Sequence, residues 1–262
     1  MMLLQFENIT AGYGKKTVLD GFSLDIPAGS VTALIGRNGC GKSTLLGTIP
    51  GTVKPRAGRV LLDGVPIRDI PPRMLARRVA YLPQLHRAPD DIDVRTLVSY
   101  GREPFIPYGK SLSASDRAAV NEAMEAAGIA NLADRPLGTL SGGERQRAWI
   151  AMTAARTPEL MVLDEPTTYL DTACQYELLA LIRRLAKERG MTVLMVLHDV
   201  NLAARYSTRI AAVKDGRLHA AGTPAEMITP ALLGDVLGIC ARVMRDEADG
   251  CPYILPDTEG AL

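Results

Sequence analysis

A glycine-rich run that ends in a lysine and a serine is the strongest chemical signal in the sequence. Residues 36–43 read GRNGCGKS and fit the pattern G-x-x-x-x-G-K-[ST]. The glycines let backbone N–H groups converge on phosphate oxygens, and a following helix adds the positive end of its dipole. Lys42 would reach the β- and γ-phosphates of a nucleotide, and the Ser43 hydroxyl would bind Mg²⁺. The alternative is a simple glycine-rich turn, which the apolar run before it and the helical pattern after it disfavour.

Two adjacent acids end a short apolar run further along the chain. Residues 160–165 read LMVLDE. A strand that buries four apolar residues and then presents carboxylates is typical of a strand whose carboxyl end meets a ligand crevice. Asp164 would hold Mg²⁺, directly or through water, and Glu165 would polarise an attacking water. Alone this motif is weak, but the phosphate-binding pattern strengthens it.

A third motif, LSGGERQ at residues 140–146, places a serine and two glycines at the start of a helix. Ser141, Gly142 and Gly143 could form a second anion site from N–H groups and a hydroxyl. The structural alternative is that Ser141 is an ordinary N-cap.

Short apolar runs alternate with helical patterns through most of the chain. Such runs, separated by helices, predict a mainly parallel sheet covered on both faces. The predicted strands are 3–9, 31–35, 60–62, 79–82, 160–163, 192–197 and 210–213, and the predicted helices are 42–49, 94–100, 113–127, 144–156 and 173–189. The last forty residues predict small helices and a hairpin.

Together, the order and spacing of the three motifs resemble the nucleotide-binding subunit of an ATP-binding-cassette (ABC) transporter, over about residues 3–229. The signature LSGGE before a helix is highly specific to this superfamily. The resemblance implies an α/β fold: a phosphate-loop NTPase core with a mainly parallel sheet, an antiparallel β subdomain and a helical insert. We expect one domain over 1–262, with a helical subdomain at about 89–156 and a small C-terminal extension at about 224–262.

The same resemblance implies roles for further residues. Tyr13 resembles the aromatic that stacks on adenine, although a core tyrosine is the alternative. Gln84 is similar to the glutamine that contacts Mg²⁺ or the attacking water, and His198 to the switch histidine on the γ-phosphate. His86 and His219 are interpreted as structural. The expected catalytic residues are Glu165, His198, Gln84 and Lys42; the expected metal ligands are Ser43, Gln84 and Asp164; the expected nucleotide-binding residues are Tyr13, Gly36, Asn38, Gly39, Cys40, Gly41, Lys42, Ser43, Thr44, Ser141, Gly142, Gly143 and Asp171.

Partners follow from the resemblance as well. Two cassettes would form a head-to-tail homodimer, with each ATP between Lys42 of one subunit and Ser141 and Gly143 of the other. Asp171 resembles part of the loop that crosses to the opposite subunit. A single cassette without a membrane span implies separate integral membrane permease subunits, favours an importer served by a substrate-binding protein, and implies a peripheral position on the cytoplasmic face of the inner membrane.

The finer resemblance concerns the cargo. RQRAWIAM at 145–152, DEPTTYLD at 164–171 and GREPF at 101–105 are similar to ATPases of ferric-siderophore importers. Haem and vitamin B12 (cobalamin) importers belong to the same branch and stay as alternatives. A soluble cassette protein acting on ribosomes or DNA usually carries two cassettes or a long coiled coil, and a phosphate-loop kinase would lack the signature.

Composition agrees with a globular protein. The 262 residues are 47% apolar and 23% charged, and a net charge of +1 gives no electrostatic case for nucleic-acid binding. The four cysteines have neither metal-ligand nor redox spacing, so free thiols in a reducing cytosol are expected. No signal peptide or stretch of about 20 apolar residues is present in the sequence.

Overall fold

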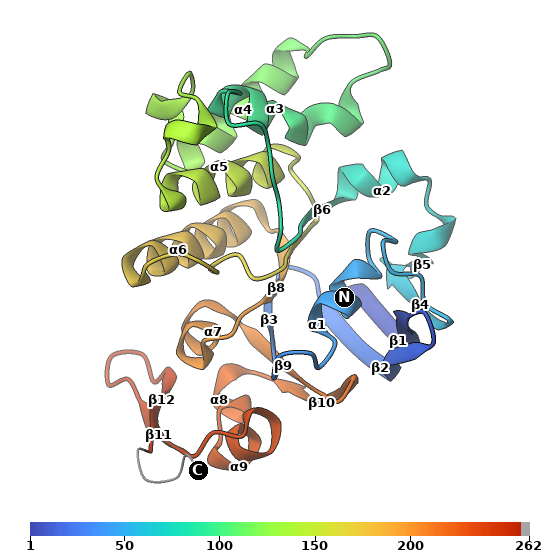
Figure 1. Ribbon diagram of the computed structural model, residues 1–262, viewed down its shortest axis with the longest axis vertical. Helices are drawn as coiled ribbons and strands as arrows, with labels where there is room; N and C mark the ends of the chain where they lie inside the picture. The colour runs from blue at the N-terminus through green and yellow to red at the C-terminus, as the bar shows by residue number, and fades with distance from the viewer. Residues whose placement is uncertain (258–262) are drawn as a thin grey trace. The chain divides into compact units, whose positions relative to one another are not determined.

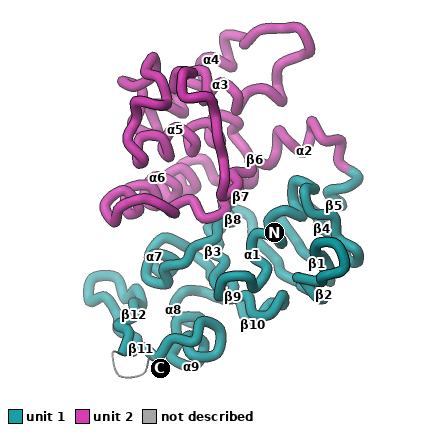
Figure 2. Tube along the Cα trace, viewed as in Figure 1, with its two compact units in different colours: residues 1–69, 193–262 teal, residues 70–192 magenta. Residues whose placement is uncertain are grey.

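The computed structural model describes residues 1–257, which form two compact units (Figures 1 and 2). Unit 1, teal in Figure 2, contains Met1–Asp69 and the chain from Val193 onward, and unit 2, magenta, contains Ile70–Thr192. The expected single domain with a helical subdomain at about 89–156 stays a prediction. The last five residues of the expected C-terminal extension lie outside the described part.

Unit 1 begins with an antiparallel sheet in the order β2-β1-β4-β5. Its largest side chains are fully buried on one face, and the rings of Phe6 and Phe22 meet edge to face with centroids 6.1 Å apart. Cross-strand aromatic pairs of this kind stabilise a sheet and fix its register. The elements are β1 (Met2–Tyr13), β2 (Lys16–Pro27), β4 (Ala57–Leu62), β5 (Val65–Pro66) and the 3₁₀ turn η1 (Ile67–Asp69).

The second part of unit 1 carries the parallel strands. β3 (Val31–Ile35) pairs in parallel with both β8 (Thr192–Val196) and β9 (Arg209–Lys214), and β10 (Arg217–Gly222) adds to β9 in antiparallel fashion. All five residues of β3 are buried, as expected for a strand covered on both faces. The helices are α1 (Lys42–Gly47), α7 (Val200–Tyr206), α8 (Pro224–Met227), α9 (Pro230–Leu232) and the π-helical turn η5 (Leu233–Leu237).

A two-stranded hairpin of β11 (Ala241–Arg245) and β12 (Pro252–Pro256) ends the described part of unit 1. β12 contacts α7, which is orange in Figure 1, whereas the hairpin itself is closer to red. The expected small helices and hairpin near the end of the chain are therefore present.

Unit 2 is mostly helical and has one parallel strand pair, β6 with β7. α5 contacts α3, α4 and α6, so it is the central helix of the unit. The elements are α2 (Pro72–Arg78), β6 (Val79–Leu82), α3 (Val94–Ser99), η2 (Tyr100–Phe105), α4 (Ala114–Ala126), η3 (Ala130–Leu132), η4 (Leu137–Thr139), α5 (Gly142–Ala155), β7 (Leu160–Leu163) and α6 (Thr172–Arg189).

A buried ion pair ties the first part of the helical unit together. Arg102 Nε lies 3.0 Å from Asp116 Oδ1, and both side chains are about one-tenth exposed. Arg102 also donates to Ala155 O at 3.0 Å and lies over the Phe105 ring, 3.8 Å from its centroid. Asp116 in turn accepts the N–H of Ser113 within the capping box of α4. One carboxylate thus joins a helix cap to the segment before α4.

The structure also contains elements that the sequence did not predict. β2, β5 and β10 pair antiparallel with neighbours, and α2 and α7 are seven-residue helices. The predicted helix 42–49 is assigned only over Lys42–Gly47, although Thr48 and Ile49 continue its turn with N–H bonds to Leu45 O and Leu46 O. The mainly parallel sheet, the antiparallel sheet and the helical segment are confirmed.

Candidate nucleotide-binding and catalytic site

The phosphate-binding loop follows β3 and leads into α1 of unit 1. Gly36 has φ 151°, and a Cβ there would lie 2.3 Å from Val213 O, closer than any side chain could. Gly41 has φ 110° and a Cβ on it would lie 2.8 Å from the side chain of Leu19. Glycine is therefore needed at both positions, once for the space beside a strand and once for the backbone turn into the helix.

Lys42 lies back over this loop. Its Nζ donates to Gly36 O at 2.7 Å and to Arg37 O at 3.1 Å, and its side chain is 6% exposed. An ammonium group held above a turn of glycines is the arrangement that a phosphate-binding lysine requires. The sulfur of buried Cys40 lies 3.7 Å from the same Nζ, inside the loop.

The remaining residues of the phosphate-binding loop differ in how exposed they are to solvent. Asn38, Gly39 and Ser43 are exposed, whereas Thr44 is buried in the first turn of α1. Because the first turn of a helix has N–H groups without intrahelical acceptors, this turn can direct N–H donors towards an anion.

Tyr13 and His198 are the other unit 1 residues predicted to act. Tyr13 ends β1 and is 60% exposed, so it is not a core tyrosine. His198 is exposed in the short link between β8 and α7, and Asp199 caps α7 by accepting the N–H groups of Asn201 and Leu202. Both side chains are accessible, and their roles stay predictions.

In unit 2 the two acids follow β7. Asp164 is 5% exposed, whereas Glu165 is half-buried and has φ 53°. A left-handed glutamate is held against a conformational preference, a cost that is found most often at functional positions. Its Oε2 accepts Gln84 Nε2 at 2.6 Å and Thr168 Oγ1 at 3.0 Å. The structure thus joins two of the predicted catalytic residues, and it adds Thr168, which the sequence analysis missed.

The signature serine begins α5. Ser141 and Glu144 form a capping box: Ser141 N donates to Glu144 Oε2 at 2.8 Å, and Glu144 N donates to Ser141 Oγ at 3.3 Å. These bonds lower the pKa of Glu144. The N-cap interpretation is therefore correct, and Ser141 and Gly142 are still exposed. A Cβ on Gly143 would lie 2.7 Å from the sulfur of Cys174 in α6, so glycine allows these helices to approach.

Asp171 caps α6 by accepting the N–H of Cys174 at 2.8 Å. This bond is the main reason why the pKa of Asp171 is lowered, and the carboxylate beside it raises the pKa of the Cys174 thiol. Asp171 is exposed and stays ionised at neutral pH.

His86 links three segments of unit 2 that the sequence left unconnected. Its Nδ1 lies 2.9 Å from Pro83 O, its Nε2 lies 3.2 Å from Gln146 Oε1, and its ring packs against Trp149 of α5. Gln146 Nε2 donates to Pro166 O at 2.9 Å. The loop that carries Gln84, the signature helix and the loop after Glu165 are thus connected, and His86 is structural, as interpreted.

Comparison with known proteins now defines the class. The model of the family described as ABC transporter matches residues 19–168, and the chain belongs to this family. It is therefore an ABC-type ATPase with the ABC ATPase fold, as the motifs predicted. Within residues 1–257, no helix is long and apolar enough to cross a membrane.

Two of the similar proteins are ATP-binding proteins named for iron-chelate or hemin transport. The chain is 44% identical to the ferric enterobactin transport ATP-binding protein FepC of Escherichia coli (strain K12), over 97% of this chain and 93% of that protein. It is 40% identical to the hemin import ATP-binding protein HmuV of Bordetella pertussis (strain Tohama I), over 93% of this chain and 95% of that protein.

Solved structures give the same result. A metal-chelate type ABC transporter in an inward-facing conformation superposes with TM-score 0.84 at 25% identity, over 98% of both chains. The ATP-binding cassette MJ0796, solved as a dimer in a post-hydrolysis state with ADP and phosphate, gives TM-score 0.71 at 27% identity, over 84% of this chain and 98% of that chain.

Proposed function

We propose that the chain is the ATP-hydrolysing subunit of an importer for iron chelates, with a ferric siderophore as cargo. The observation that carries the proposal is the nearly full-length similarity to ATP-binding proteins that are named for ferric-chelate uptake. A haem importer is the alternative, which the similarity to HmuV favours, and a cobalamin importer is a weaker one.

In unit 1 the phosphate-binding loop and two exposed side chains bind ATP. Lys42 and the backbone N–H groups from Gly36 to Thr44 bind and orient the phosphates of ATP. Tyr13 stacks on the adenine, and His198 contacts the γ-phosphate.

In unit 2 the chemistry falls to Glu165. Its carboxylate accepts a proton from the attacking water as the bond from the water oxygen to the γ-phosphorus forms and the bond from that phosphorus to the β–γ bridging oxygen breaks, so that ADP leaves and phosphate is released. Gln84 and Thr168 hold that carboxylate in place through their bonds to Oε2. Because the Gln84 amide nitrogen is used here, its oxygen is left as an acceptor for a metal or a water.

The donor set suits Mg²⁺. Ser43, Gln84 and Asp164 offer a hydroxyl, an amide oxygen and a carboxylate, which are hard oxygen ligands. Among residues 1–257 no group of three or more His, Cys, Asp and Glu could form an all-protein metal site. Mg²⁺ usually takes one or two protein ligands together with phosphate oxygens, and when bound it neutralises phosphate charge.

The partners that we propose are a second copy of this chain and integral membrane permease subunits, with a substrate-binding protein acting through the permease. Ser141, Gly143 and Asp171 of one copy face ATP that is held by Lys42 of the other. The dimeric cassette among the similar structures supports this arrangement. The complex would place the chain on the cytoplasmic face of the inner membrane.

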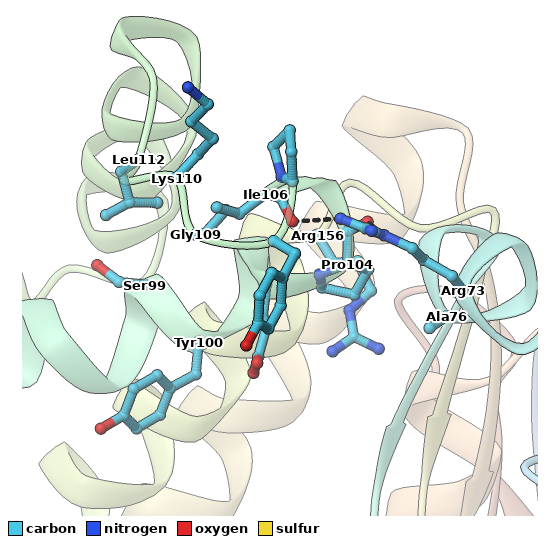
Figure 3. A pocket seen from close by; sticks show the side chains of 13 residues that line it. Arg73, Ala76, Ser99, Tyr100, Pro104, Ile106, Gly109, Lys110, Leu112 and Arg156 are labelled. Atoms are coloured by element: carbon cyan, nitrogen blue, oxygen red, sulfur yellow. Dashed lines mark hydrogen bonds between the residues drawn. The ribbon is translucent and has the colours of Figure 1, made fainter.

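A cavity of unit 2 supports a permease contact (Figure 3). It has a volume of about 760 Å³ and is lined by Arg73, Tyr100, Ile106, Tyr108 and Arg156, among others. Arg73 donates to the backbone oxygens of Pro104, at 2.9 Å, and of Ile106, which holds one wall in place. The lining thus combines apolar and aromatic side chains with three cationic residues, Arg73, Lys110 and Arg156, and one acid, Glu103, which suits an apolar and acidic cytoplasmic segment of the permease.

The test is to introduce a charge at the docking surface. Ile106→Glu in this cavity and Leu85→Glu, which replaces a side chain that is 75% exposed, should leave the ATPase rate of the isolated subunit within about twofold and abolish chelate uptake. Val65→Glu is the matched control, because Val65 is a 45% exposed apolar residue of unit 1. Unchanged uptake of iron chelates with both variants would place the docking site elsewhere.

A further inference from the structure

His198 lies in a three-residue link whose two ends are fixed by different elements of unit 1. Before it, Leu197 N donates to Leu34 O of β3 at 3.2 Å. After it, Asp199 caps α7 with bonds of 2.7 Å and 3.0 Å. The exposed ring of His198 therefore takes its position from β3 on one side and from α7 on the other.

α7 depends on contacts with the rest of unit 1 for its position. It has only seven residues, and a helix this short is unstable without tertiary contacts. Leu202 and Ala203 pack into the core of unit 1. Asn201 and Arg205 are four residues apart and so share another face of the helix. Both of these side chains bond to the C-terminal hairpin of β11 and β12.

Asn201 makes two hydrogen bonds to one residue of β12. Its Oδ1 accepts Ile254 N at 2.7 Å, and its Nδ2 donates to Ile254 O at 3.3 Å. A side-chain amide carries a donor and an acceptor side by side, so it can bond to both backbone groups of one residue as the next strand of a sheet would. The hairpin edge is thereby joined to the third residue after His198.

Arg205 forms ion pairs with two residues in the turn of the hairpin. Its Nη2 lies 2.6 Å from Asp246 Oδ2, and its Nη1 lies 2.7 Å from Asp249 Oδ2. The second oxygen of each carboxylate is used within the turn, where Asp246 accepts Ala248 N and Asp249 accepts Cys251 N. The turn thus presents two oriented carboxylates to one guanidinium, a geometry stronger than a simple surface pair.

We propose that the hairpin of β11 and β12 positions His198 for contact with the γ-phosphate, and that Asn201 and Arg205 are the positioning residues. The inference rests on the role proposed above for His198. Loss of the hydrogen bonds of Asn201 or of the ion pairs of Arg205 leaves one face of α7 without its contacts to the hairpin. The end of the link that α7 fixes, and with it His198, is then less well positioned. Nucleotide affinity depends mainly on the phosphate-binding loop and should therefore change little.

The kinetic test uses the full chain and compares Asn201→Ala and Arg205→Ala with wild type. We expect kcat for ATP to fall about tenfold and KM to change less than about twofold, because misplacing a catalytic group by a fraction of an ångström costs turnover. Arg205→Lys, which keeps one charge, should recover part of the loss. Arg242→Ala is the control, because it breaks the 3.4 Å ion pair with Asp257 and leaves α7 untouched.

A double variant tests whether the effect passes through the histidine. In a His198→Ala background, Asn201→Ala should lower kcat no further, since the group that it positions is gone. A further tenfold loss in that background would overturn the inference.

The ring signals of the three histidines in a nitrogen-15 NMR spectrum separate the inference from the proposed role of His198. The His198 signal should shift or broaden in Asn201→Ala and Arg205→Ala and stay in place in Arg242→Ala, and the His86 signal should not move. If the ring signal moves and kcat does not, the hairpin positions His198 but the catalytic role fails. An unmoved ring signal in both variants overturns the hairpin inference.

Discussion

Replacing Glu165 by glutamine should separate ATP binding from ATP turnover. The substitution keeps the number of side-chain atoms and removes the charge. In the structure a single carboxylate oxygen accepts both Gln84 Nε2, at 2.6 Å, and Thr168 Oγ1, at 3.0 Å. A carboxamide oxygen can accept the same two bonds, so the side chain should stay where it is.

The magnitudes decide which effect dominates. Charged acceptors make bonds about twice as strong as neutral ones, so two weakened bonds on a half-buried side chain cost about 1–2 kcal/mol of folding free energy. Loss of a general base costs about 10²–10⁴ in rate, which is about 3–5 kcal/mol in the barrier. Turnover should therefore collapse in a protein that remains folded and still binds ATP through Lys42.

The assay measures ATP hydrolysis, ATP affinity by calorimetry and dimer mass by light scattering on one preparation. We expect kcat to fall at least about a hundredfold, Kd for ATP to stay within about threefold, and an ATP-bound dimer to accumulate. Thr168→Ala, which removes one bond to the carboxylate and keeps the charge, should lose about tenfold or less. Turnover of Glu165→Gln within about fivefold of wild type would show that another residue activates the water.

Two other predictions concern assembly and acid stability. Mixing Lys42→Ala with Ser141→Arg subunits should leave at most one intact composite site per heterodimer, and a crosslink from Ser141 to ATP in its own subunit would contradict this. Asp116→Asn should lower the free energy of unfolding by about 3 kcal/mol at pH 7, because it breaks the buried pair with Arg102. The Ser113 hydroxyl and then the other bonds of the site hold the pKa of Asp116 below its ordinary 3.8, so the wild-type advantage is complete above that value and disappears as the pH falls through the lowered pKa. Denaturant titrations that give the same difference at pH 7 and at a pH where Asp116 is protonated in both the folded and the unfolded state would refute this account.

The sequence predicts best where local chemistry dictates the structure. The sequence predicts the strand 31–35 with the bounds that the structure has, because its four apolar residues and one threonine are followed by Gly36, a position with no room for a side chain. The capping box at Ser113 likewise marked the start of α4. The phosphate-binding loop belongs to this class, since its geometry is encoded within eight consecutive residues.

What the sequence missed depends on partners far along the chain. β2 has a recognisable alternation, but its twelve residues include two exposed neighbours at Asp20 and Gly21, and its pairing with β1 decides its length. α7 is short, and Asn201 bonds to a residue 53 positions away. The bond between Gln84 and Glu165 spans 81 positions. No local pattern encodes such contacts, and they are the ones that orient the site.

The most direct test of the proposed function is uptake of iron chelates in cells that lack this chain. Such cells would receive wild type or Glu165→Gln, expressed at equal level, and a panel of hydroxamate, catecholate and haem chelates labelled with radioactive iron. We predict that wild type restores uptake of at least one siderophore and that Glu165→Gln restores none. Restoration by Glu165→Gln, or failure of wild type with every chelate despite ATP hydrolysis in the test tube, would contradict the account.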